Sequence, residues 1–183
     1  MATSSSTRSP WWSRARGLPP AAYASWSASL SARPARILAW ARTAVGFCIG
    51  SPSTLSYDDE SGWRHLGWHE IERGGWDADT GELRWTELAP PGSAPAAGSL
   101  ALTEPGRLPE LFRERVSATI AVEKFVALSG SRGVVVTARR DLARDGAITW
   151  HATLTRGLTW QTDGVRPAVD EALAELRKEY DLS

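Results

Sequence analysis

Residues 63–88, WRHLGWHEIERGGWDADTGELRWTEL, decide the fold of this chain, because they combine alternating side chains with a compact turn. The alternation places Leu66 and Trp68 on one side of an extended segment and His65 and His69 on the other. Two adjacent glycines then interrupt the run, which predicts a bulge or a sharp bend. An Asp-Ala-Asp-Thr-Gly sequence follows and supplies turn residues. The stretch therefore predicts two antiparallel strands joined by a turn.

Two turn geometries are compatible with residues 77–81. A two-residue loop at Thr80 and Gly81 places Trp76 directly opposite Trp85. A three-residue loop with Gly81 in the left-handed region shifts the register by one residue and sends the two indoles to opposite faces. We favour the two-residue loop.

The same reasoning extends to the rest of the chain. Apolar residues at helical spacing predict helices over 108–120 and 165–180, and Pro109 is compatible with the first turn of the earlier one. Alternation and turn residues predict extended segments over 36–42, 46–49, 54–57, 99–103 and 122–128, an exposed loop over 89–98, and a second hairpin over 133–139 and 147–155. The fold class is therefore α+β and mainly antiparallel: a β-barrel or sandwich with an amphipathic helix, plus a C-terminal β-hairpin and helix.

The N-terminal part of the chain differs in composition from the rest. Residues 1–57 contain six arginines and no acidic residue, which leaves 15 basic against 21 acidic residues in the remainder. We predict that residues 1–33 form a disordered or partner-dependent tail and that residues 34–180 form one domain. The tail is compatible with a targeting segment, a docking tail or a misassigned start. Its indoles and neighbouring arginines are the candidate contacts with a partner: Trp11, Trp12, Arg14 and Arg16.

Residue types that carry catalysis or bind metals are sparse in this sequence. Cys48 is the single cysteine and has no partner for an intramolecular disulfide. His65 and His69 are four residues apart, and on a strand this spacing puts them roughly 13 Å from each other, too far to share an ion. No nucleophile motif, phosphate-binding loop or paired cysteines are present. We therefore assign no catalytic, cofactor-binding or metal-binding residues.

One local pattern resembles a known fold family. The segments HLGWHEIER at 65–73, WD at 76–77 and GELRW at 81–85 resemble two successive strands of the bacterial pleckstrin-homology-like domains. Together with RERVSAT at 113–119, they also resemble a family of uncharacterised actinobacterial proteins. The resemblance covers roughly residues 34–180 and implies a strand meander closed by a helix, to which the segments after Leu128 are an addition. It implies no established activity.

Charge argues against two classes of partner. Eukaryotic relatives of that fold often bind phosphoinositides through basic residues between the first two strands, whereas here no basic residue lies between Arg42 and Arg64. Nucleic-acid binding through the Arg-rich N-terminus is a third and less favoured hypothesis, because heavy use of Arg, Ala and Gly is more typical of a GC-rich genome than of a nucleic-acid-binding protein. No apolar run is long enough to span a membrane. The sequence therefore predicts a cytoplasmic bacterial protein that binds a protein partner or a second copy of itself without catalysis. The alternative is a protein, or a weakly marked enzyme, that binds a small molecule in a pocket lined by Trp and His.

Overall fold

The computed structural model describes residues 17–31, 36–143 and 146–180. The chain divides into two compact units, Met1–Pro34 and Ala35–Ser183.

The described part of the first unit is one short helix, α1 (Pro20–Ser29). It begins with a proline, which is tolerated in a first turn because that backbone N–H would have no helical acceptor. The rings of Tyr23 and Trp26 lie 5.9 Å apart. The sequence pattern does not predict this helix, because its apolar residues do not gather on one face.

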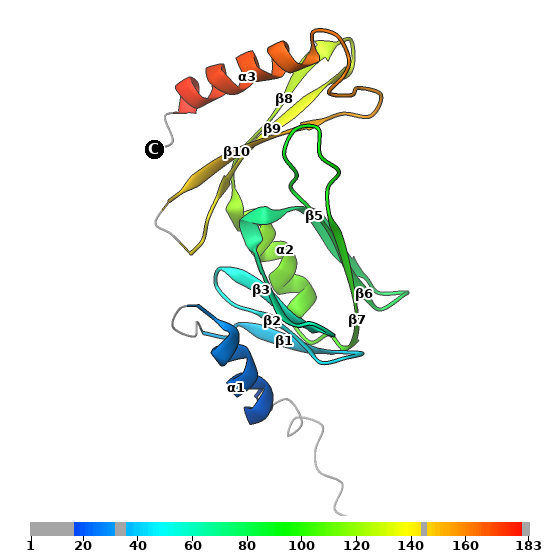
Figure 1. Ribbon diagram of the computed structural model, residues 1–183, viewed down its shortest axis with the longest axis vertical. Coiled ribbons are helices and arrows are strands. Elements are labelled where there is room, and N and C mark those ends of the chain that lie inside the picture. The colour runs from blue at the N-terminus through cyan, green and yellow to red at the C-terminus, as the bar shows by residue number, and fades with distance from the viewer. Residues whose placement is uncertain (1–16, 32–35, 144–145, 181–183) are drawn as a thin grey trace, which may run out of the picture. The chain divides into compact units, whose positions relative to one another are not determined.

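A seven-stranded antiparallel sheet begins the second unit (Figure 1). Its strands lie in the order β4-β3-β2-β1-β7-β6-β5, so that β4 and β5 form the two edges although they follow each other in sequence. Its strands are β1 (Ala39–Thr43), β2 (Phe47–Gly50), β3 (Thr54–Asp59), β4 (Gly62–Gly67), β5 (Ile71–Asp77), β6 (Glu82–Glu87) and β7 (Ala97–Glu104).

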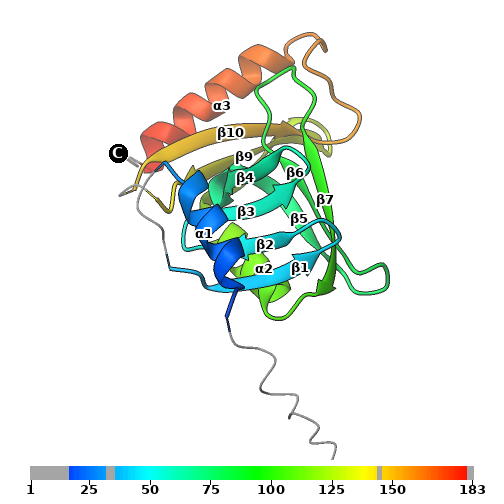
Figure 2. The same cartoon turned by 60° about the horizontal axis from the view of Figure 1, so that its bottom comes forward.

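The helix α2 (Leu108–Thr119) closes the curled sheet, and we call this sheet and helix the half-barrel (Figure 2). It packs against β1, β2 and β5, so it reaches both halves of the sheet. Phe112 meets the ring of Trp68 edge-on at a centroid distance of 5.9 Å, and both residues are buried. The Trp68 indole N–H donates to the carbonyl of Ser51 at 3.0 Å, which satisfies its polar group inside the core.

The predicted first strand of residues 63–88 is interrupted. β4 ends at Gly67, and a 3-10 helix, Trp68–Glu70, precedes β5. Its geometry is fixed by a hydrogen bond from the backbone N–H of Gly67 to Oε2 of Glu70 at 2.6 Å. The turn brings Trp68 into the core and carries the chain from one edge of the sheet to the other.

The hairpin register also differs from the prediction. Trp76 lies opposite Leu83, and Trp85 lies opposite Gly74. The connection has four residues, 78–81, and the backbone N–H of Gly81 donates to the carbonyl of Asp77 at 2.9 Å. The two-residue loop is therefore wrong. Because the real register differs from the predicted one by an even number of residues, both indoles still lie on the same face of the sheet.

A three-stranded sheet follows α2 without an intervening loop. Its strands, β8 (Ile120–Ser129), β9 (Arg132–Arg140) and β10 (Ile148–Leu154), lie in the order β10-β9-β8, and we call them the second sheet. The helix α3 (Val165–Tyr180) packs against all three strands. The buried residues of this second core are Val134, Val136, Val165, Val169 and Leu176.

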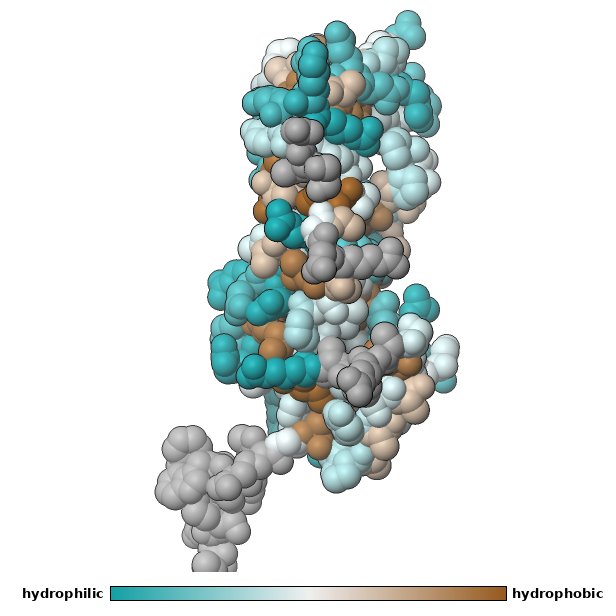
Figure 3. All heavy atoms as spheres, turned by 90° about the vertical axis from the view of Figure 1, so that its left-hand side faces the viewer, coloured by the Kyte–Doolittle hydropathy of each residue, from teal (hydrophilic) through white to brown (hydrophobic). Residues whose placement is uncertain are grey.

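The opposite side of α3 faces solvent. Its exposed residues include Asp170, Glu171 and Glu175. In Figure 3, hydrophilic side chains dominate the upper part of the visible face, and apolar residues appear in separate patches below them. The predicted fold class is confirmed: the protein is α+β with mainly antiparallel strands, a curled half-barrel, a second sheet and a C-terminal helix.

Candidate functional site

The partner contacts predicted from the sequence belong to the N-terminal tail. Trp11, Trp12, Arg14 and Arg16 lie outside the described residues. The histidines, in contrast, are all described, and two of them lie beside a cavity.

The three histidines have different surroundings. His65 on β4 shares a hydrogen bond with Oγ of Ser56, with its Nδ1 2.8 Å away. His69 lies in the 3-10 turn, with its Nδ1 3.6 Å from Oδ1 of Asp141. His151 on β10 is half-buried and faces the half-barrel. Among the described residues, no three metal-binding side chains gather in one place.

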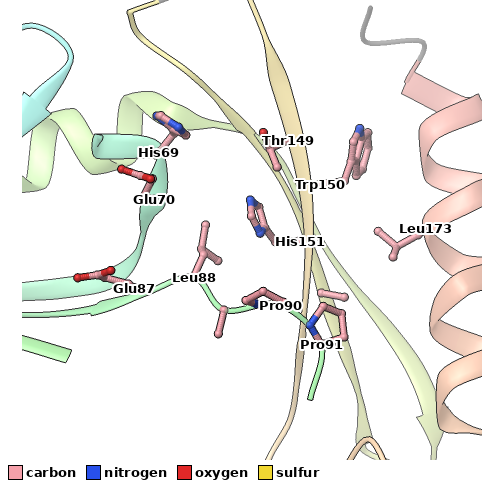
Figure 4. A pocket seen from close by; sticks show the side chains of 12 residues that line it. His69, Glu70, Glu87, Leu88, Pro90, Pro91, Thr149, Trp150, His151 and Leu173 are labelled. Atoms are coloured by element: carbon pink, nitrogen blue, oxygen red, sulfur yellow. The ribbon is translucent and has the colours of Figure 1, made fainter. Parts of the chain in front are cut away.

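Two cavities lie along β10, and together we call them the β10 groove. The first has a volume of about 430 Å³ and the second of about 420 Å³. Both are lined by Ala89, Pro90 and Ala152, so they continue into each other. The first reaches Thr149 on β10 and the second reaches Leu154, which makes the groove follow almost the whole strand. Figure 4 shows the first cavity, with the segment through Leu88, Pro90 and Pro91 opposite β10.

One wall of the groove is acidic and belongs to the half-barrel. It carries Glu70, Glu72 and Glu87, with Arg73 as the one basic residue that lines it from this side. The carboxylate of Glu72 accepts a hydrogen bond from Oγ1 of Thr153 at 2.8 Å, so this wall is bonded directly to β10. The wall therefore favours basic or neutral groups over anions.

The other wall is apolar and belongs to the second core. Trp150 and Leu154 project from β10 on the side that packs against α3, and Leu173 of α3 lines the groove beside them. In Figure 4, Trp150 and Leu173 lie on one side of β10 and His151 on the other. The groove thus lies along the edge of β10, with the acidic wall on one side and the apolar wall on the other.

His151 is a titratable residue that lines the first cavity of the groove. Burial lowers its pKa below the ordinary value, and the charges of Arg139 and His69 lower it further, against an opposing effect of Glu72. The ring is therefore neutral at neutral pH, with one nitrogen that donates and one that accepts. It makes no side-chain hydrogen bond to any residue that the structure describes.

Arg139 of β9 is hydrogen-bonded to the acidic wall through the backbone of Glu72. Its side chain is only 3% exposed. One guanidinium nitrogen donates to the carbonyl of Val116 at 3.2 Å and to Oγ1 of Thr119 at 2.9 Å. The other terminal nitrogen donates to the carbonyl of Glu72 at 2.8 Å. A single side chain of β9 therefore links the end of α2 to β5 and fixes the groove.

Cys48 takes no part in this site. It is fully buried in the half-barrel core, and burial raises the pKa of its thiol far above the ordinary value. The thiolate is the reactive form of cysteine, so this residue behaves as a small apolar side chain.

Comparison of the chain with family models, with curated protein sequences and with solved structures gave no match. None of the helices in the described ranges has the length and apolar character needed to cross a membrane.

The groove itself is not predicted by the sequence, because its walls come from segments far apart in the chain. Two signals point to its parts. The first is the run of prolines after β6, Pro90, Pro91 and Pro95, and the second is the alternation of Trp150 and Leu154 with polar residues on β10. Neither signal reveals that the two segments face each other.

Proposed function

We propose that this protein is a non-enzymatic binding or assembly module that holds a protein partner in the β10 groove. The observation that supports the proposal is the groove itself, which follows most of β10 between an acidic wall and an apolar wall. Interfaces draw most of their binding energy from a few anchors in desolvated pockets, and Trp150 is of the type that serves as such an anchor. In this proposal the protein acts in the bacterial cytoplasm.

We further propose that the half-barrel is a pleckstrin-homology-like domain. What supports this proposal is the curled sheet of seven antiparallel strands closed by α2. β8, β9, β10 and α3 are then an addition to that domain, and the groove lies where the addition meets it. The proposed binding site is thus separate from the loop between the first two strands.

A groove-filling variant tests the binding function. Ala89 lines both cavities, so Ala89→Trp in the full-length chain fills the groove from its loop side. Ala101→Trp places the same side chain at an exposed position of β7 and serves as the control. Affinity capture from native extract should retain a stoichiometric protein with the wild type and with A101W, and lose it with A89W. Equal capture by all three chains contradicts the proposal.

A small-molecule site is the second candidate function, and one observation favours it. The 430 Å³ cavity combines Trp150, His69 and His151, a stacking surface with two groups able to form hydrogen bonds. A metabolite that raises the melting temperature of the wild type, but not that of A89W, would support this function. The same metabolite acting equally on both chains would exclude the cavity as its site.

A further inference from the structure

The backbone of β10 carries hydrogen-bonding groups that point away from its own sheet. At one end of the β9–β10 ladder the N–H of Asp141 donates to the carbonyl of Ala147 at 2.9 Å. At the other end the N–H of Thr155 donates to the carbonyl of Gly133 at the same distance. Hydrogen-bonded and non-hydrogen-bonded residue pairs alternate along an antiparallel ladder. These two bonds therefore determine which of the pairs between them are hydrogen-bonded.

This alternation identifies the residues of β10 whose backbone N–H and C=O groups are not bonded to β9. Thr149, His151 and Thr153 pair with Arg139, Thr137 and Val135, and these are the pairs whose backbones bond to each other. The backbone N–H and C=O groups of Trp150 and Ala152 therefore point outward from the sheet edge. Both residues line the groove, and neither backbone is bonded to another residue within the described ranges.

The segment opposite this edge cannot complete the sheet. Pro90, Pro91 and Pro95 lie along it, and proline has no backbone N–H to donate. The segment leaves an open gap rather than a paired strand, since two adjoining cavities separate it from β10. The proline-containing segment thus lies opposite the edge of β10 but forms no strand pairing with it.

The side chains on the two walls define what an added strand would carry. Successive residues of a strand point to opposite faces. On one face an incoming strand would meet Trp150, Leu154 and Leu173, which are apolar. On the other face lies the half-barrel wall, with His69, His151, Arg73 and three glutamates. Of these glutamates, Glu72 is bonded to Thr153 of β10, whereas Figure 4 shows the carboxylates of Glu70 and Glu87 directed away from β10. The three carboxylates outnumber the one guanidinium on that face.

We propose that the free edge of β10 binds an extended peptide segment of a partner protein in which apolar and basic residues alternate, and that this segment adds a fourth strand to the second sheet. Apolar side chains of the segment pack on the Trp150 side, and its Lys or Arg side chains face the glutamates. The stretch from Trp150 to Leu154 spans about 13 Å and accommodates roughly five residues of the segment. This inference rests on the proposed function of protein binding and names the chemistry of the partner.

Peptide selection on the full-length chain is the first part of the test. A library of random peptides of about 12 residues covers the length of the groove with flanks on both sides. Selection should enrich sequences in which apolar residues alternate with Lys or Arg. The affinities of synthetic versions would then be measured by fluorescence anisotropy, alongside versions with Glu in place of each basic residue.

A proline substitution then locates the binding edge. The N–H of Ala152 points away from β9, so Ala152→Pro removes a free donor without removing a bond of the ladder. Ala127→Pro is the matched control, because Ala127 is an exposed residue on β8, the opposite edge strand of the same sheet. Its partner on β9 is Gly133, and by the same alternation of bonded pairs the N–H of Ala127 also points away from β9. We expect A152P to weaken the selected peptides by about tenfold or more and A127P to change their affinity by less than about twofold.

The charge of the acidic wall is tested separately. Glu87→Gln should weaken the basic peptides by about threefold at low salt, an effect that diminishes as salt rises. Glu171→Gln on the exposed side of α3 is its control and should have no effect.

The outcomes distinguish failure of the strand-addition inference from failure of the proposed protein-binding function. Peptides that bind equally to A152P and A127P would show that protein binding exists but does not use the β10 edge. Selected peptides that are acidic, or that lack alternation, would overturn the proposed partner chemistry. If no peptide is enriched by a chain that does capture a stoichiometric partner, the partner binds by a folded surface and the strand-addition inference is wrong. If the chain neither selects peptides nor captures a partner, the proposed function fails with it.

Discussion

The half-barrel and the second sheet bury their cores in different ways. In the half-barrel a single curled sheet surrounds α2, and its core contains the large rings of Trp68, Trp85 and Phe112. The second sheet has three strands and one helix, and its buried core consists of valines and a leucine. Sheets of so few strands have little core of their own and depend on packing against other elements. We infer that the half-barrel provides most of the stability and that the second sheet depends on it.

The largest expected effect comes from removing one ring from the first core. Phe112 is 1% exposed and contacts Trp68, so Phe112→Ala should lower the free energy of unfolding by about 3–5 kcal/mol. Leu176→Ala in the second core should lower it by about 2–3 kcal/mol, because a smaller side chain leaves a smaller cavity. Urea unfolding followed by tryptophan fluorescence measures both. A larger effect of L176A than of F112A would indicate that the half-barrel depends on the second sheet for its stability.

Removing Arg139 should loosen the connection between the two regions. Its three hydrogen bonds join β9 to α2 and β5, and Arg139→Met keeps much of its volume while removing them. We expect a loss of about 2–3 kcal/mol, mostly because the carbonyls of Val116 and Glu72 lose a charged donor. Hydrogen exchange should then become faster in β8–β10 while the half-barrel strands keep their protection. Uniformly faster exchange across both regions would show that they unfold as one.

Arg139→Lys distinguishes the geometry of this group from its charge. An ammonium group is a compact charge, whereas the guanidinium donates along several directions at once. The lysine variant should therefore restore less than half of the stability lost in R139M. Full restoration would show that the positive charge alone joins the two regions.

A pair of glycines tests how tightly the half-barrel is packed around Trp85. A Cβ on Gly98 would collide with the indole of Trp85, whereas a Cβ on Gly75 meets nothing within 4 Å. Gly98→Ala should cost about 1–3 kcal/mol and shift the tryptophan emission, because Trp85 must move. Gly75→Ala should leave both properties nearly unchanged. Similar effects of the two substitutions would mean that Trp85 moves without cost.

The smallest expected effect is a pH dependence that originates at the boundary between the two regions. The pKa of His151 is lowered in the folded protein, chiefly by burial, so the unfolded chain binds a proton more readily. His151 therefore contributes to a fall in stability as the pH decreases below about 6.5, the ordinary pKa of histidine. His151→Asn, which does not titrate, should reduce the difference between urea midpoints at about pH 7.5 and 5.5. An unchanged difference would assign the dependence to other groups.

Parts of this fold follow from local patterns. The last helix was predicted over 165–180 and is observed as Val165–Tyr180, because Val169, Ala172 and Leu176 define one buried face. α2 was predicted for the same reason and is confirmed within one residue. The faces of the first hairpin were also correct despite its wrong register, since four loop residues in place of two preserve the side on which each residue lies.

Other parts depend on contacts that no local pattern contains. The 3-10 turn at Trp68–Glu70 looks like a strand in sequence, because its apolar and polar residues alternate, but Trp68 is drawn into the core by Phe112 and Ser51. The partnership of β8 with the second hairpin was missed, since nothing near residue 120 indicates which strand it joins. The groove was missed because Pro90 and Ala152 are distant in sequence. The assignment of Trp11, Trp12, Arg14 and Arg16 as partner contacts stays a prediction.

The direct passage from α2 to β8 has a consequence for how this protein can be divided. The helix ends at Thr119 and the strand begins at Ile120, so no loop separates the half-barrel from the second sheet. Proteases cut most readily at exposed, flexible segments, and this junction offers none. Limited digestion should not release the second sheet as a fragment at this point. A truncation meant to isolate the half-barrel would find no loop between α2 and β8 in which to end.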